Sequence, residues 1–195
     1  LESVSLAIAT FKTNKKPVIA IGDNFNQAQY YLASMADKIY LNPMGSVEMH
    51  GFSGYQTYMK DLLDQLAINV HIFRVGQFKS FVEPFIRNDM SPEARENLQQ
   101  WMDEQWLSYT QTIEQRRGLH ANAINTYINT QDQLLAKQLN NPAASAKSFG
   151  LVDELATRNE TEGFINALTN ETPAKRIDAI AYYKQQQQLK KTSLM

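Results

Sequence analysis

The chain has 195 residues, which is enough for one domain with its own hydrophobic core. Hydrophobic residues make up 43% and charged residues 20%, as in ordinary globular domains, and this excludes the disordered and collagen-like classes. With 19 basic and 20 acidic side chains the formal net charge is -1, so electrostatics give no reason to expect a nucleic-acid partner.

The beginning of the chain indicates a piece of a longer polypeptide. The first residue is Leu1 rather than Met, and the apolar residues from Leu1 to Phe11 already lie at helical spacing. No apolar run approaches the roughly 20 residues that a spanning helix needs, and no charged leader precedes an apolar stretch. We therefore expect any membrane anchor to lie outside this sequence.

The first third of the chain alternates short strands with helices. Apolar, mostly β-branched residues between Pro17 and Gly22 predict a short strand that is covered on both faces. The following predicted elements are a helix over 26–36, a strand over 38–41, a helix over 55–66 and a strand over 69–75. This succession favours an α/β layered domain with crossover helices.

A long helix is predicted to begin at Ser91. Serine is a good N-cap, Pro92 suits the first helical position, and Glu93 favours the positive end of the helix dipole. The helix can run to Arg117, because Gly118 stops it. Its many apolar side chains predict that much of one side is buried, either in this domain or against a neighbour.

Short helices are expected in the last third of the chain. They cover residues 120–128, 131–139, 142–149 and 161–168, and residues 177–183 are a further strand candidate. Four consecutive glutamines, 185–188, lead into a polar end that need not be ordered. We predict one domain over residues 1–183, incomplete at its N-terminus, and a polar tail or linker over 184–195.

Neither a metal nor a cofactor is expected. His50, His71 and His120 do not form a metal-binding spacing such as HExxH, and the eight glycines do not form a phosphate-binding loop. The absence of cysteine removes disulfides, thiolate metal sites and a cysteine nucleophile, without separating one compartment from another.

Lys79 is the residue with the clearest potential for chemistry. It stands among Phe78, Phe81, Val82 and Phe85, directly after a predicted strand. Apolar surroundings lower the pKa of a lysine, and a neutral amine can act as the base that a serine–lysine dyad requires. From these residues alone, the alternative is a surface lysine that extends its ammonium to water or pairs with Glu83.

A resemblance to a known family decides between these alternatives. Residues 73–76, 79–80 and 82–95 resemble the signature of the long, two-repeat form of bacterial signal peptide peptidase, the protease IV type. Further matching segments are residues 16–18, 29–34, 36–39 and 50–52. The resemblance is clear over residues 1–118 and thinner through residues 149–153.

The resemblance implies a crotonase-like or Clp-protease-like fold and an incomplete catalytic dyad. In this family the amino-terminal half carries the catalytic lysine and the carboxy-terminal half carries the nucleophilic serine, so Lys79 corresponds to the general base. Gln27 occupies the position that matches the nucleophile, and glutamine cannot form an acyl enzyme. Other local hydroxyls, which do not fall at that position, are Ser34, Ser46, Ser53 and Ser80. We therefore expect this chain to be inactive alone.

The resemblance also implies substrate, partners and location. The family degrades cleaved signal peptides, which predicts apolar peptides bound in extended form in a hydrophobic groove. The loop 43–54 could form one wall, with Met44 and Met49 expected in the core. The expected partners are the serine-bearing carboxy-terminal half and further copies of the chain. The expected location is the periplasmic face of the bacterial inner membrane, with membrane contact through parts outside this chain.

Two other classes of function are weighed against this one. The chain could be an inert assembly module that builds a crotonase-like oligomer, in which the long aromatic helix contacts other subunits. An acyl-thioester enzyme of the crotonase class is weaker, because it needs an oxyanion hole and a bound coenzyme and no residue signals either. Fold resemblance by itself does not decide among them.

Overall fold

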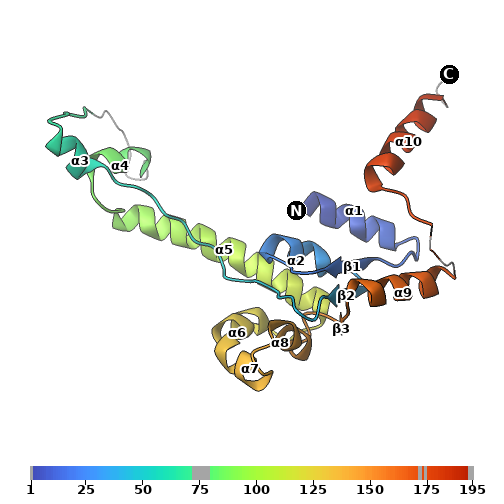
Figure 1. Ribbon diagram of the computed structural model, residues 1–195. Coiled ribbons are helices and arrows are strands. Elements are labelled where there is room, and N and C mark those ends of the chain that lie inside the picture. Colours follow the sequence, from blue (N-terminus) through green and yellow to red (C-terminus); the bar gives the residue numbers. More distant parts are fainter. Residues whose placement is uncertain (1, 72–79, 171–172, 174, 193–195) are drawn as a thin grey trace.

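The computed structural model describes residues 2–71, 80–170, 173 and 175–192. The chain folds into a mixed α/β body, rich in helix, from which a long arm extends (Figure 1). The expected α/β class is therefore confirmed, with a small parallel sheet in the body.

Three short parallel strands form the sheet. They are β1 (Ile19–Gly22), β2 (Lys38–Leu41) and β3 (Glu154–Leu155), in that spatial order. Ile19 pairs with Lys38, and the register continues along both strands. β2 is the central strand, and its Ile39 and Leu41 side chains are fully buried. Parallel strands with both faces covered favour such apolar residues.

Helices connect the strands and cover the sheet. α1 (Glu2–Lys12) precedes β1, and α2 (Gln27–Ala33) is the crossover between β1 and β2. α2 begins with a capping box in which Asn26 and Gln29 exchange side-chain and backbone hydrogen bonds. The connection from β2 to β3 is much longer and contains the arm, α5 (Pro92–Arg117) and three short helices, α6 (Ala123–Asn129), α7 (Gln131–Lys137) and α8 (Pro142–Phe149).

The hydrophobic core lies between the sheet, α2, the C-terminal end of α5 and the short helices. Its fully buried large side chains include Tyr30, Ile39, Leu41, Ile113, Ile124, Tyr127 and Leu151. Because some of these side chains, such as Tyr30 and Leu151, are more than 100 residues apart in the sequence, they join an early and a late part of the chain into one body.

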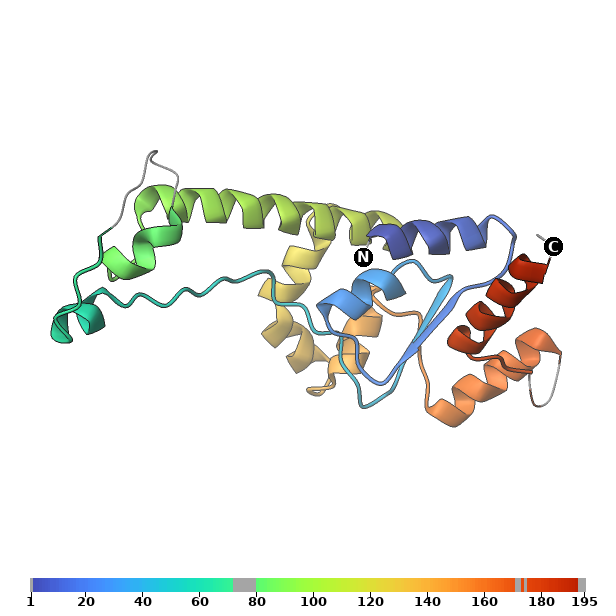
Figure 2. The same ribbon diagram turned by 90° about the horizontal axis from the view of Figure 1, so that it is seen from above.

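The arm consists of the described residues from His50 to Ser108. It contains α3 (Lys60–Gln65), the 3-10 turn η1 (Ser80–Val82), α4 (Glu83–Ile86) and the N-terminal part of α5. Figures 1 and 2 both show it extending away from the sheet. Among the described residues of the arm, Pro84 is the only apolar side chain that is buried. The arm therefore has almost no hydrophobic core of its own.

The long helix confirms its predicted bounds and only part of its predicted burial. Ser91 caps α5, and Gly118 ends it in the left-handed conformation. Tyr109 and Ile113, near its C-terminal end, are buried in the body, whereas Trp101 in the arm is 58% exposed. The apolar side of the helix is thus covered by this chain only where the helix crosses the body.

The predicted helix over 55–66 is too long. Only α3 is helical there, and residues 51–59 run without regular structure from the body to the tip of the arm. An extended chain spans about 3.3 Å per residue against 1.5 Å in a helix, so few residues reach the far end of α5. In the predicted strand over 69–75, residues 69–71 are not strand, and residues 72–75 lie outside the described residues.

The predicted strand over 177–183 is wrong, because this region begins a helix, α10 (Ala179–Thr192). The Asp178 carboxylate accepts hydrogen bonds from the N–H groups of Ile180 and Ala181, at 2.9 and 3.1 Å, and so caps the first turn. The glutamines and lysines that follow are good helix formers. α10 continues past residue 184, and the division between domain and tail at that residue stays a prediction.

The body is completed by α9 (Arg158–Thr169), for which residues 161–168 were expected. α9 begins earlier because Thr157 and Glu160 form a capping box. The Phe164 ring stacks on Tyr40 of β2, with ring centroids 5.3 Å apart. Helix α9 is thus held against the central strand.

Candidate functional site

Lys79, the predicted general base, lies outside the described residues. The described chain resumes at Ser80 with η1, which leads directly into α4 at the tip of the arm (Figure 1). The described part of the site therefore consists of the residues that hold this segment, and the position of the lysine amine stays a prediction.

A buried carboxylate joins α4 to the start of α5. The Glu83 side chain is 3% exposed. Its Oε1 accepts a hydrogen bond from the Ser91 hydroxyl at 2.5 Å, and its Oε2 accepts one from the Ser91 N–H at 3.1 Å. The Ser91 Oγ in turn accepts from the Ala94 N–H at 3.2 Å. Ser91 thus caps the long helix and also binds Glu83, the acid four residues after Lys79 in the sequence.

The extended segment of the arm is fastened to the same tip. The Met59 N–H donates to the Pro84 carbonyl at 2.7 Å. Asn88 and Asp61 bond to each other twice, at 2.6 and 3.1 Å. Burial, and then the negative charge of Glu83, raises the pKa of Tyr58, so that its phenol stays protonated.

A hollow of about 280 Å³ lies beside these contacts. Its lining includes Tyr58 from the extended segment, Ser80 and Glu83 from the tip, and Leu98 and Trp101 from α5. The lining mixes aromatic and aliphatic side chains with hydroxyl and carboxyl groups. It is a half-apolar recess next to the residue that follows Lys79.

Gln27, the first residue of α2, is hydrogen-bonded through its side chain to the backbone of His50 and Gly51. Gln27 Oε1 accepts hydrogen bonds from the His50 and Gly51 N–H groups at 3.2 and 3.1 Å. Its Nε2 donates to the Gly51 carbonyl at 3.2 Å. The position that is expected to match the nucleophile therefore carries an amide that ties α2 to the root of the arm.

An aromatic cluster stands at this root. Trp106 stacks on Tyr109, with ring centroids 5.2 Å apart, and Phe52 meets Trp106 edge-on at 5.8 Å. The Tyr109 hydroxyl donates to the Gln27 carbonyl at 2.8 Å, and burial raises the pKa of this phenol far above its ordinary value. The cluster connects α5 to both the β1–α2 turn and the loop after Gly51.

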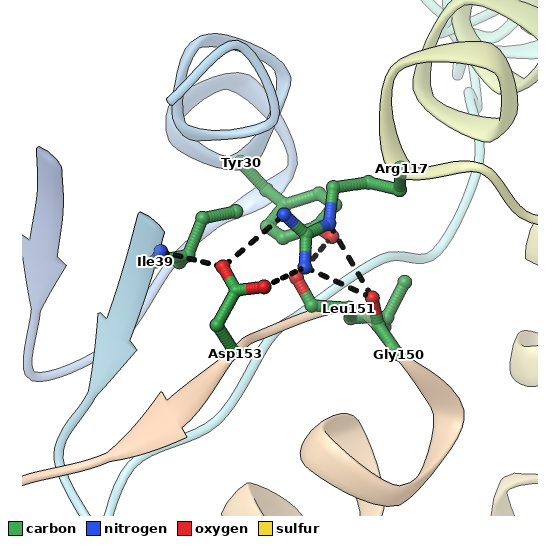
Figure 3. A network of polar contacts seen from close by, with 6 residues as sticks. All are labelled: Tyr30, Ile39, Arg117, Gly150, Leu151 and Asp153. Atoms are coloured by element: carbon green, nitrogen blue, oxygen red, sulfur yellow. Dashed lines mark hydrogen bonds and ion pairs between the residues drawn. The ribbon is translucent and has the colours of Figure 1, made fainter. Parts of the chain in front are cut away.

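The C-terminal end of α5 is locked to the sheet by a polar network (Figure 3). Arg117 pairs with Asp153 at 3.1 Å and donates to the Gly150 carbonyl at 3.2 Å. Asp153 also accepts from the Ile39 N–H of β2 at 2.7 Å, and the Tyr30 hydroxyl donates to the carbonyl of Leu151 at 2.6 Å. The C-terminal end of α5 is thus bonded to the segment before β3, and that segment is bonded in turn to β2 and α2.

The other residues that the sequence raised as candidates have local roles. The Ser34 hydroxyl is buried and donates to the Tyr31 carbonyl, and Ser46 donates to Asn24. Ser53 is exposed, and all three histidines are exposed, with His50 and His120 near neighbouring carbonyls. Among the described residues, no group of three or more acidic or histidine side chains could hold a metal ion.

One expectation for the loop 43–54 is wrong. Met49 is buried as predicted, at 5% exposure, but Met44 is 91% exposed. Met44 follows Pro43 in a turn, where its N–H bonds to the Asn42 side chain, and this turn points it away from the core.

Comparison with known proteins assigns the class. Residues 10–170 match peptidase family S49, and the chain belongs to this family. It is 45% identical to Protease 4 of Haemophilus influenzae over 86% of the chain and 27% of that protein. It is 40% identical to Protease 4 of Salmonella typhi over 92% of the chain and 29% of that protein.

These matches confirm the resemblance to protease IV that the sequence motifs indicated, and they are consistent with its amino-terminal half. The chain spans less than a third of the length of these two relatives. In the part of the chain that the structure describes, no helix combines the length and the apolar character needed to cross a membrane.

Sequence reasoning missed several contacts of the site. Ser91 was recognised as a cap but not as the donor to Glu83, and Gln27 was recognised as a non-nucleophile but not as an anchor for Gly51. The sequence drew attention to Glu83 only as a possible partner of Lys79, four residues before it. No local pattern points to the Gln27 contacts, because the partners are 24 residues apart.

Proposed function

We propose that this chain is the lysine-supplying portion of a serine–lysine signal peptide peptidase. Lys79 acts as the general base, and the nucleophilic serine comes from the carboxy-terminal half of the polypeptide. The observation that carries the proposal is that Lys79 stands within the protease IV signature of a chain that belongs to peptidase family S49.

The chemistry divides between the two halves. The neutral Lys79 amine accepts the proton of the serine hydroxyl as the serine oxygen attacks the peptide carbonyl. The same group then returns the proton to the leaving amine, and a water molecule hydrolyses the acyl enzyme. The neutral form needs apolar cover over the lysine, and because Phe81 and Phe85 are exposed in this chain, that cover comes from the rest of the complete enzyme. The side chain at position 27, an amide already bonded to the His50–Gly51 backbone, is in keeping with a nucleophile supplied elsewhere.

The remaining parts of the proposal concern fold, substrate and place. The body belongs to the crotonase/Clp-protease-like layered folds, of which its strand–helix–strand unit is a part. The substrates are apolar signal peptides bound in extended form, and the half-apolar recess at the arm suits such side chains. The enzyme works at the periplasmic face of the bacterial inner membrane, and the peptidase assembles as a homo-oligomer.

Two substitutions of the lysine test the base. In the full-length polypeptide, Lys79→Ala abolishes turnover of a signal-peptide substrate, and Lys79→Arg does not restore it because guanidinium stays protonated. Lys137→Ala, an exposed lysine of α7, is the matched control and retains activity. Circular dichroism checks that all variants fold. Peptide hydrolysis by either Lys79 variant would refute the assignment.

A second candidate function is an inert assembly module, which the arm favours. Its exposed apolar side chains include Tyr55, Leu62, Leu66, Phe81 and Trp101, while Pro84 is its only buried apolar residue among those described. A surface of this kind calls for cover by another part of the assembly. Sedimentation of this chain, with a peptidase assay of the full-length polypeptide, separates the candidates: a stable oligomer and a Lys79→Ala enzyme that retains its activity favour the module.

A further inference from the structure

Residues 52–58 of the arm form an extended segment that has no neighbouring strand in the described chain. They run from the body towards the tip of the arm (Figure 2), and at about 3.3 Å per residue they can span about 23 Å. Among the described residues, none is hydrogen-bonded to the backbone N–H or C=O groups of this segment. Both edges of the segment are therefore open to pairing with another backbone.

The side chains of the segment alternate between two faces, as they do in a strand. On one face, Phe52 meets Trp106 of α5 edge-on, with ring centroids 5.8 Å apart, and Tyr58 lines the recess beside α5. The other face is exposed, and its central side chain, Tyr55, is exposed to 97%. Contacts with α5 thus hold one face of the segment and leave its edges free. The exposed face carries Ser53, Tyr55 and Thr57.

The composition of the segment also suits strand pairing. Phe, Tyr and Thr favour strands, and no residue from 51 to 59 is charged or is a proline. Proteins commonly protect an open strand edge with lysine, with proline or with a bulge. Because the sequence of this segment carries neither lysine nor proline, its edges can accept a further strand.

The chemistry of the segment limits what can cover it. Only another extended polypeptide supplies hydrogen-bond donors and acceptors at the spacing of such an edge. An uncharged segment favours an uncharged partner, since a charge brought beside it would lose water without gaining a counter-ion. The segment also ends at the recess, which Tyr58 lines together with Ser80. A peptide paired along it would therefore lie in line with the candidate site.

We propose that residues 52–58 are a binding edge for the substrate peptide, an extended apolar polypeptide that pairs with them as an added strand. The identity of the peptide rests on the proposed function, whereas the edge itself does not depend on the catalytic base. Tyr55 offers its ring to the apolar side chains of the added strand. Because main-chain bonds supply much of the affinity, the edge accepts peptides of different sequence.

Amide hydrogen exchange of this chain tests the edge, because it reports on individual N–H groups. The probe is a synthetic signal peptide at saturating concentration. Alternate N–H groups of residues 52–58, those on the paired edge, should exchange at least about tenfold more slowly. The matched control is the same peptide with every backbone nitrogen methylated, which cannot pair and gives no protection. Unchanged exchange in the segment, whether or not the peptide binds elsewhere, overturns the proposal.

Other occupants of the edge give different results in the same measurement. Protection that appears without peptide and rises with protein concentration would mean that a second copy of the chain pairs there. Protection without peptide in the full-length polypeptide would mean that another segment of that polypeptide covers the edge. Either result overturns the substrate as the occupant.

Proline substitutions measure the contribution of the edge in the full-length polypeptide. Tyr55→Pro removes one N–H group and keeps the backbone extended, whereas Tyr55→Ala keeps the N–H group. Gln56→Pro and Gln56→Ala make the same comparison on the opposite edge, because successive N–H groups of a strand alternate in direction. At one of the two positions, KM of the proline variant should exceed that of the alanine variant about 3- to 10-fold, with equal kcat. Equal KM values at both positions contradict the proposal.

Lys79→Ala, measured in parallel, separates this inference from the proposed function. If that variant of the full-length polypeptide stays active while the peptide protects residues 52–58, the proposed base is wrong and the binding edge stands. If it is inactive and exchange in the segment is unchanged, the binding edge alone is wrong.

Discussion

The body and the arm use the same device, a buried carboxylate that accepts hydrogen bonds at the start of a helix, in different surroundings. In the body, Glu114 is 6% exposed and accepts from the N–H groups of Asn122 and Ile124, at 3.1 and 3.0 Å, at the start of α6. In the arm, Glu83 binds Ser91 at the start of α5. Glu114 lies among core side chains such as Ile113 and Ile124, whereas the core cluster includes none of the described residues at the tip of the arm, where Glu83 lies.

The comparison separates contacts that set the free energy of unfolding from contacts that set the local structure of the arm. In the body, apolar burial supplies most of the free energy of folding, and polar contacts choose among packed arrangements. The described residues of the arm bury little apolar surface, so polar contacts have a larger share in fixing where its segments lie. Substitutions in the body should therefore change the free energy of unfolding, whereas substitutions in the arm should change local structure and, under the proposed function, catalysis.

The largest effect is expected in the centre of the sheet. Ile39→Ala removes a fully buried side chain of β2 and should lower the free energy of unfolding of this chain by about 2–5 kcal/mol. Leu66→Ala, at a residue 60% exposed in the arm, should change it by less than about 0.5 kcal/mol. Urea denaturation followed by circular dichroism measures both, and equal losses would contradict the division into body and arm.

The next effect is expected at the Arg117–Asp153 pair, which connects α5 to the segment before β3. Asp153→Asn weakens the pair with Arg117, whose side chain is 10% exposed, and should cost about 1–3 kcal/mol in the same denaturation experiment. A matched surface control is Glu154→Gln, since Glu154 pairs with Lys147 in solvent. That control should change the unfolding free energy by less than about 1 kcal/mol.

The same acid gives the body a defined response to pH. Burial opposes ionisation of Asp153, but hydrogen bonds from Arg117 and from the Ile39 N–H outweigh it and hold the pKa below its ordinary value. The stability that this group contributes is therefore complete above about pH 4 and is lost as the pH falls through the lowered folded-state pKa. The difference in unfolding free energy between wild type and Asp153→Asn should shrink over that range. A difference that grows on acidification would contradict the assignment.

The third effect compares the two carboxylates directly. Glu114→Gln places an amide donor against one of two backbone N–H groups and should lower the unfolding free energy by about 1–2 kcal/mol. Glu83→Gln should change the global unfolding free energy less, because the arm contributes little to the core. A global loss for Glu83→Gln as large as that for Glu114→Gln would mean that the arm and the body unfold as one unit.

Local sequence signals predicted the elements whose ends are marked by caps. The strand over 38–41 and the helix over 142–149 have the predicted bounds, and Ser91 and Gly118 correctly bounded the long helix. The wrong predictions are in segments whose secondary structure depends on contacts outside the segment or on a cap that was overlooked. Residues 55–59 carry part of a helical pattern but are drawn out along the arm, and the apolar residues 177–183 resemble a strand until the Asp178 cap is seen.

The candidate site was predictable only in part, for a similar reason. The position of Lys79 in a family signature identified the base as a hypothesis, and the non-nucleophilic nature of Gln27 follows from its side chain alone. The anchors do not follow from spacing. Glu83 in α4 and Ser91, the cap of α5, are eight residues apart, and Gln27 meets Gly51, 24 residues further along the chain. Such contacts depend on the packed fold rather than on a repeat in the sequence.

The smallest effect is expected at the root of the arm, where the two regions meet. Gln27→Ser leaves a side chain too short to reach the His50 and Gly51 backbone, and it should cost about 1 kcal/mol because the freed N–H groups can bond to water. Gln111→Ser, on the exposed face of α5, is the control for the change of residue type.

Limited proteolysis is the sharper measurement of this last variant, since the Gln27 amide fixes the loop that leads into the extended segment 51–59. Cleavage near Gly51 should become faster in Gln27→Ser while the unfolding midpoint of the body moves little. The introduced hydroxyl should give this chain no peptidase activity, because a nucleophile also needs its base and an oxyanion site in register. Hydrolysis of a signal peptide by the Gln27→Ser chain alone would mean that one half can hold a complete site.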